Sequence, residues 1–171
     1  MKKIYQLKSI LDLVIVFSMM VIGFVIIGLT YGLVTGNMGK MNIAFQGQKI
    51  DSLDSFLLSI IVVMIIGYAF FMYSIFQLKK LVNLFIKREF FTDLSVKTLK
   101  MIGVTMLTSS ILLTIPVSLY AAFGAADFKI MLGSLTPDSM VFPFIIALFF
   151  IILSSIFNEA KRIKEDNELT I

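Results

Sequence analysis

The sequence predicts an all-α, polytopic membrane protein, a bundle of four transmembrane helices with both termini in the cytoplasm. Of its 171 residues, 58% are hydrophobic and 15% are charged, against about 45–50% and 25% in soluble chains. A core of this size cannot bury so much apolar surface, so the bilayer must act as part of the solvent. Residues 1–171 are therefore expected to form a single membrane domain.

Four apolar runs poor in charge supply the predicted helices: residues 10–34, 56–76, 101–123 and 140–157. Each run has about 18 residues or more, enough at 1.5 Å per residue to cross about 30 Å of hydrocarbon. The first run is too long for the apolar part of a secretory signal, and no small-residue cleavage site is evident after it. We expect it to be a retained anchor.

The distribution of basic residues predicts the orientation. Twelve of the 15 lie before the first run, in the loop 77–100 or in the tail 158–171, and the other two loops hold three. The positive-inside rule therefore places both termini and the middle loop in the cytoplasm. Because this topology and anionic lipid headgroups account for the basic residues, no direct binding to nucleic acid is expected.

The missing residue types exclude several chemistries. With no His and no Cys, the chain cannot form a Ser-His-Asp or Cys-His nucleophile pair, a His/Cys zinc site or a disulfide. No spacing of the remaining polar residues assembles a nucleophile and a base. The expectation is a protein that is not an enzyme and that needs no metal or cofactor.

The first run carries Gly28, Gly32 and Gly36 at four-residue spacing, which predicts a face that a neighbouring helix can approach closely. The alternative is that Gly36 ends the helix and Gly32 is incidental. Such a face serves packing within one chain or between copies, so a homo-oligomer stays open. Asp12, at the start of this run, is expected at the cytoplasmic interface with Lys8 one helical turn away.

The loop 77–100 begins with an apolar stripe at helical spacing, which predicts that the second helix continues as an amphipathic extension turning along the headgroups. The stripe comprises Leu78, Leu81, Val82, Phe85 and Ile86, and the other face comprises Lys79, Lys80, Asn83 and Lys87. After it, Thr92 is predicted to cap the third helix, with Asp93 favouring the helix dipole and Phe91 packing onto Val96.

The third run contains Ser110, Thr114 and Ser118 at four-residue spacing, and Pro116 within the same helix. The hydroxyls are expected to bond to neighbouring helices, and Pro116 is expected to kink the backbone. The alternative is that the kink and the hydroxyls mark a pocket or gate. Outside the membrane, residues 41–45 are predicted to form a short strand.

The tail 158–171 holds four acidic and three basic residues, against six basic and two acidic residues in the loop 77–100. Opposite net charge on one membrane face suggests that the tail folds back on the loop, or that both face a shared partner. A solvated tail is the alternative, since exposed ion pairs are weak.

Two stretches resemble a known family. Phe91 and Thr92 precede Ile102 and Gly103, and the chain ends in Leu169, Thr170 and Ile171 after an acidic segment. With four membrane spans, this pattern resembles the bacterial family called domain of unknown function 2975 over nearly the whole chain. Glu168 stands where the family usually has Asp, and the first external loop is short. The resemblance implies a bacterial cytoplasmic membrane protein, often encoded beside small helix-turn-helix regulators.

The leading hypothesis is therefore a non-enzymatic membrane anchor or sensor that binds a cytosolic helix-turn-helix regulator. The alternative is a small-molecule or lipid carrier, a pore or an export accessory, with the hydroxyls of the third helix lining a cavity. The residues expected to bind the partner lie in the middle loop and the tail. They are Lys87, Arg88, Phe91, Thr92, Glu165, Asp166, Glu168, Leu169, Thr170 and Ile171.

Overall fold

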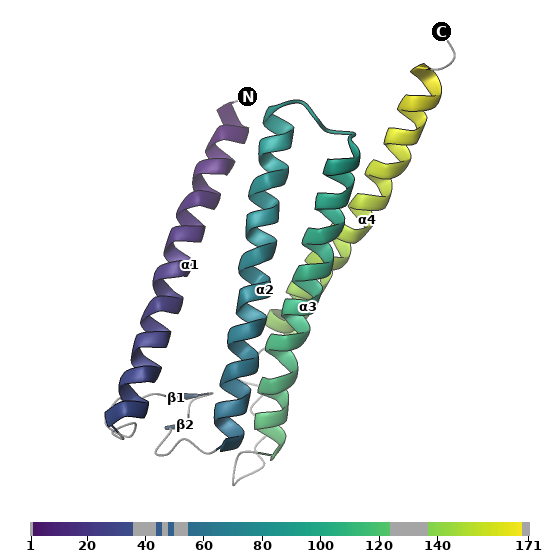
Figure 1. Ribbon diagram of the computed structural model, residues 1–171. Coiled ribbons are helices and arrows are strands. Elements are labelled where there is room, and N and C mark those ends of the chain that lie inside the picture. The colour runs from purple at the N-terminus through teal and green to yellow at the C-terminus, as the bar shows by residue number, and fades with distance from the viewer. Residues whose placement is uncertain (1, 36–43, 46–47, 50–54, 124–136, 169–171) are drawn as a thin grey trace.

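The computed structural model describes residues 2–35, 44–45, 48–49, 55–123 and 137–168. It contains four long helices, α1 (Lys2–Thr35), α2 (Ser55–Ile86), α3 (Asp93–Phe123) and α4 (Pro137–Glu168) (Figure 1). Two short strands, β1 (Ala44–Phe45) and β2 (Gln48–Lys49), pair antiparallel between α1 and α2. The predicted all-α class with four helices is confirmed. Of the strand predicted over residues 41–45, only Ala44–Phe45 falls within the described residues, and it is the strand β1.

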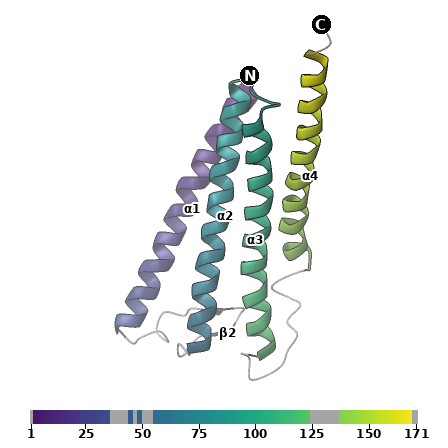
Figure 2. The same ribbon diagram turned by 45° about the vertical axis from the view of Figure 1, so that its right-hand side comes forward.

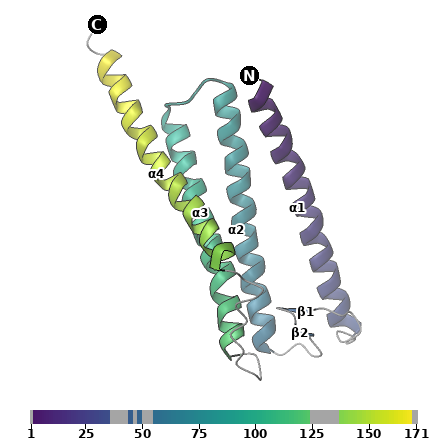
Figure 3. The same ribbon diagram turned by 180° about the vertical axis from the view of Figure 1, so that it is seen from behind.

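Each of the four helices contains a stretch long and apolar enough to cross a membrane. The first residues of α1, the turn between α2 and α3 and the last residues of α4 lie at one end of the molecule, and the two strands lie at the other (Figures 1 and 3). The segments that carry most of the basic residues are thus brought to the same end. We call this the turn end.

The helices pack in chain order, α1 against α2, α2 against α3 and α3 against α4 (Figure 2). The result is a row with α1 and α4 at its two edges, more open than the predicted bundle. Large apolar side chains of α1 are exposed, among them Phe24, which is 70% accessible. In a membrane such side chains need no protein partner, because lipid acyl chains are as apolar as a leucine side chain.

Two apolar clusters join the helices near the turn end. Leu11 and Ile15 of α1 pack with Met72, Ile75 and Val82 of α2. Leu81 of α2 packs with Leu99 and Ile102 of α3 and with side chains of α4. These clusters keep the extension of α2 in line with the rest of the helix, so the prediction that it turns along the headgroups is wrong.

Two glycines lie where neighbouring helices approach closely. A Cβ atom on Gly103 would lie 2.6 Å from Cγ1 of Ile151 and 2.9 Å from the carbonyl oxygen of Ala147 in α4. One on Gly67 would lie 3.0 Å from Cβ of Leu112 in α3. In α1, Gly32 is buried and Gly28 half-buried, while Gly36 lies outside the described residues.

The hydroxyls of α3 behave differently from the prediction. Ser110 donates to the carbonyl of Met106 and Ser118 to that of Thr114, both in their own helix. The bond that crosses to α2 comes from Ser109, whose Oγ donates to the carbonyl of Gly67 at 2.8 Å. In an apolar medium a serine readily takes the carbonyl four residues before it, which explains the difference. The helix continues through Pro116 to Phe123.

Candidate functional site

The turn between α2 and α3 is a Schellman motif. The N–H of Glu89 donates to the carbonyl of Leu84 at 3.0 Å, and the N–H of Arg88 donates to that of Phe85 at 3.1 Å. Arg88 has a φ of 63°, a left-handed conformation that costs a side-chain-bearing residue about 1 kcal/mol and that glycine adopts freely. Arg88 therefore stands where the backbone alone would favour glycine. No glycine or asparagine marks the motif in the sequence.

Thr92 caps α3 as predicted. Its Oγ1 accepts the N–H of Ser95 at 3.2 Å, which satisfies one of the free amides of the first turn. The fully buried Ser95 completes the arrangement, because its Oγ donates to the carbonyl of Glu89 at 2.5 Å. The start of α3 is thus tied to the residue that ends the Schellman motif. The role of Ser95 was missed by the sequence reasoning.

Four phenylalanine rings form an aromatic cluster at the turn end. Phe85, in the last turn of α2, lies 5.2 Å from Phe90 and 6.1 Å from Phe157 of α4, and Phe157 lies 5.3 Å from Phe91. Separations of this size are typical of favourable aromatic pairs. Phe90 and Phe91 keep 38% and 43% of their surface exposed. The ring contact of Phe91 is with α4, whereas the sequence predicted packing on Val96.

Beyond Phe157, α4 continues as a polar helix to Glu168, a length of about 16 Å at 1.5 Å per residue. This segment, residues 158–168, is called the polar extension. It projects past the turn at the yellow end of the ribbon (Figure 1). The prediction that the tail folds back on the loop is therefore wrong for the described part of the tail.

The charges of the polar extension pair in another way. Glu165 pairs with Lys161, and Glu168 with Lys164, each four residues before it on the same helix. The link to the loop is made by Lys161, whose Nζ lies 2.6 Å from Oδ1 of Asp93 at the start of α3. A basic residue of the tail thus contacts an acidic residue of the loop, whereas the sequence suggested an acidic tail against a basic loop. Ser154 adds a bond from α4 to the carbonyl of Val96 at 3.0 Å.

Asp12 also has a different partner from the predicted one. Its carboxylate forms an ion pair with Lys79 of α2, and both side chains are partly exposed. Further from the turn end, Tyr68 donates from its hydroxyl to the carbonyl of Ser18 at 3.2 Å. These two contacts and the apolar cluster around Leu11 hold α1 to α2.

The predicted partner-binding residues fall into three groups. Lys87, Arg88 and Phe91 are exposed at the turn, and Thr92 is half-buried by its capping role. Glu165, Asp166 and Glu168 are exposed on the polar extension. Leu169, Thr170 and Ile171 lie outside the described residues. Within the described residues, no group of three or more acidic side chains is placed to hold a metal ion.

No curated protein and no solved structure matches the chain. The profile of one family, described as "Protein of unknown function (DUF2975)", matches residues 13–171. The match includes about two thirds of α1, from residue 13 on, the other three helices, the turn with Phe91 and Thr92, and the C-terminal residues. Because it covers far more than half of the sequence, the chain belongs to the DUF2975 family.

Proposed function

We propose that this protein is a non-enzymatic membrane anchor or sensor whose turn end binds a cytosolic protein, and that the partner is a helix-turn-helix transcriptional regulator. The observation that carries the proposal is the shape of this end. The polar extension projects about 16 Å beyond a cluster from which Phe90 and Phe91 remain exposed. A soluble protein could contact the aromatic side chains and the helix together.

The chemistry of the turn end supports binding to a protein. Exposed aromatic and arginine side chains are enriched among the residues that dominate binding energy at protein interfaces. Here Phe90 and Phe91 lie in the same turn as Lys87 and Arg88, and Glu165 and Glu168 are exposed on the neighbouring helix. A surface carrying both signs of charge around apolar side chains can select a partner and fix its orientation. The choice of a helix-turn-helix regulator comes from the gene neighbourhood of the family.

The proposed location is the bacterial cytoplasmic membrane, with the turn end in the cytoplasm. Twelve of the 15 basic residues belong to the segments that gather at this end or lead into it. Such an excess is typical of the cytoplasmic side of a membrane protein.

The alternative, a carrier or pore of small molecules or lipids, draws less support. It needs the hydroxyl stripe of α3 to be available in a cavity. Ser110 and Ser118 instead donate to carbonyls of their own helix. We therefore propose docking and not transport.

Affinity purification from the native membrane tests the proposal. The tagged full-length protein is compared with a form that stops after Asn158 and with the triple variant Glu165→Lys, Asp166→Lys and Glu168→Lys, and co-purifying soluble proteins are identified by mass spectrometry. A DNA-binding protein recovered only with the intact tail is the expected result.

A matched control is the pair Asp51→Lys and Asp54→Lys, which reverses charge in the segment before α2, at the other end of the chain's second span. This control should retain the partner. Equal recovery with all forms would reject the role of the tail, and equal loss in the control would point to a general charge effect.

A further inference from the structure

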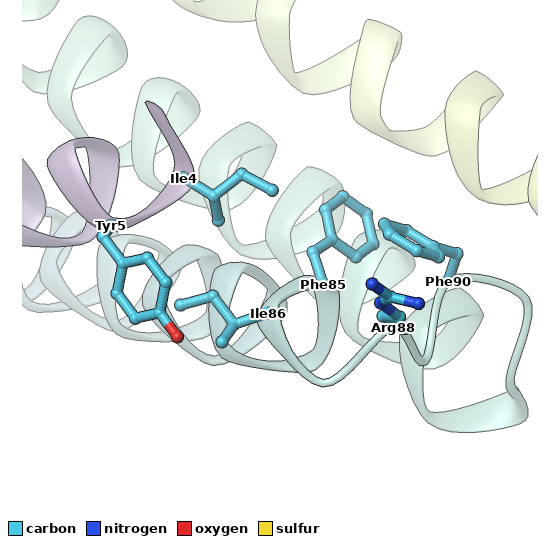
Figure 4. Close-up of a pocket in the computed structure, with 6 residues that line it drawn as sticks. All are labelled: Ile4, Tyr5, Phe85, Ile86, Arg88 and Phe90. Atoms are coloured by element: carbon cyan, nitrogen blue, oxygen red, sulfur yellow. The ribbon is translucent and has the colours of Figure 1, made fainter. Parts of the chain in front are cut away.

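A cavity of about 390 Å³ lies at the turn end between the start of α1 and the end of α2. It is lined by Ile4, Tyr5, Phe85, Ile86, Arg88 and Phe90. Figure 4 shows Ile4 and Tyr5 reaching from α1, while Arg88 extends from the turn beside the rings of Phe85 and Phe90 in this view. Its volume is within the range of sites that take small molecules, about 300–1,000 Å³.

The lining combines an apolar wall with one cation. Isoleucine and phenylalanine side chains provide most of it, and among the described residues that line it Arg88 is the only charged one. Within the described part of the chain, the ion pairs of this end engage Lys79, Lys161, Arg162 and Lys164, and none engages Arg88. An arginine without an acidic partner is available to an anion, and its planar fork of N–H groups suits phosphate.

The backbone of Arg88 is a second, independent observation. A φ of 63° in a Schellman motif favours glycine, so the backbone conformation gives no reason for an arginine here. Residues held in unfavourable backbone conformations cluster at functional sites. The arginine places its charge at the cavity at a cost to the backbone.

The position of the cavity indicates the kind of anion. Ile4 and Tyr5 precede the apolar run of α1, and Phe85 and Ile86 follow that of α2, so the cavity lies at the level where headgroups meet acyl chains. Tyrosine is enriched at this level in membrane proteins. A free phosphate would use Arg88 but not the apolar wall, whereas a phospholipid uses both.

The geometry points to a binding site for one anionic phospholipid, with its phosphate on Arg88 and part of an acyl chain against Ile4, Phe85 and Ile86. The site shares Arg88 and Phe90 with the surface proposed to bind a protein, but lipid binding can be tested without that partner. Binding at this site differs from general attraction to the membrane surface, because it depends on one cation, Arg88, and on one cavity.

Native mass spectrometry of the full-length protein released from micelles tests the site. The protein is incubated with equal amounts of phosphatidylglycerol and phosphatidylcholine that have the same acyl chains. We expect phosphatidylglycerol adducts to dominate by about tenfold, the effect of one charge-assisted contact. Arg88→Gly should abolish this preference while the protein stays at least as stable, since glycine suits the backbone.

Lys87→Ala is the matched control, because it removes the adjacent cation of the same turn, which does not line the cavity. Lys87→Ala should change the preference for phosphatidylglycerol by no more than about twofold, because an exposed surface charge contributes little. A third variant, Ile4→Trp, should reduce binding of the lipid, because the larger side chain fills the apolar part of the cavity.

Three results would overturn the inference. The first is an unchanged preference in Arg88→Gly, and the second is an equal loss in Lys87→Ala, which would indicate a diffuse basic surface. The third is displacement of the lipid by millimolar inorganic phosphate, which would indicate an anion site without an acyl-chain contact. None of these results depends on whether a soluble protein co-purifies.

Discussion

The Nζ atom of Lys161 lies 2.6 Å from Oδ1 of Asp93, which joins the polar extension of α4 to the first turn of α3. Asp93 also lies at the positive end of the α3 dipole, where a carboxylate is favoured. Phe91, two residues before Asp93, and Phe157, four residues before Lys161, have their rings in contact. Together these contacts join the start of the polar extension to the start of α3.

Replacing Lys161 by Met should loosen the polar extension without unfolding the protein. The variant keeps an unbranched side chain of nearly the same length and removes the charge that contacts Asp93. Amide hydrogen exchange in residues 158–168 should become faster. Lys164→Met is the matched control, because it also removes a pair with a glutamate four residues later but makes no contact with α3 among the ion pairs described. Equal exchange in the two variants would contradict the role of Asp93.

Arg88→Gly should be more stable than Arg88→Ala. Both changes remove the guanidinium, but only glycine relieves the left-handed backbone, so the expected difference in the free energy of unfolding is about 1 kcal/mol. Thermal unfolding in one detergent measures it. If the two variants unfold at the same temperature, the Schellman conformation at Arg88 is not the dominant one in solution.

Gly103→Ala should destabilise the contact between α3 and α4. The added Cβ would lie 2.9 Å from the backbone oxygen of Ala147, and a helix backbone cannot yield as a side chain can. Overpacking of this kind costs about 1–3 kcal/mol. Gly23→Ala is the control, since nothing lies within 4 Å of that added Cβ, and it should unfold at the wild-type temperature or above.

Ser109→Ala should destabilise the protein more than Ser110→Ala. The hydroxyl of Ser109 is buried and bonds to the carbonyl of Gly67 in α2, whereas Ser110 bonds within its own helix. Hydrogen bonds between membrane helices contribute about 0.6 kcal/mol on average and up to about 1.7 kcal/mol. Thermal or detergent-induced unfolding of both variants gives the comparison, and a larger loss at Ser110 would contradict the assignment.

The parts of the fold that depend on neighbours along the chain could be predicted from the sequence. Apolar length predicted the four helices, the stripe from Leu78 to Ile86 predicted that the second helix continues, and Thr92 before Asp93 predicted the cap. These signals act over one or two helical turns, so the sequence contains all of their partners.

Contacts between helices could not be predicted in the same way. Four-residue spacing predicted Lys8 as the neighbour of Asp12. In the structure the partner of Asp12 is Lys79, which lies 67 positions further along the chain. Likewise, Gly103 entered the sequence reasoning as part of a family motif, and its close approach to Ala147 depends on the position of α4. Spacing identifies the face of a helix, and it does not say which residue of another helix meets that face.

The Asp12–Lys79 pair should be sensitive to charge sign and recoverable by a swap. Asp12→Lys places two cations at the contact between α1 and α2. Because both side chains are partly exposed, we expect a loss of about 0.5–1 kcal/mol in the free energy of unfolding. Adding Lys79→Asp restores an opposite pair and should recover most of this loss. Adding Lys80→Asp instead makes the same change in net charge one residue away, on an exposed side chain. It should recover less, and equal recovery by both second changes would show that net charge at this end matters and not the pair.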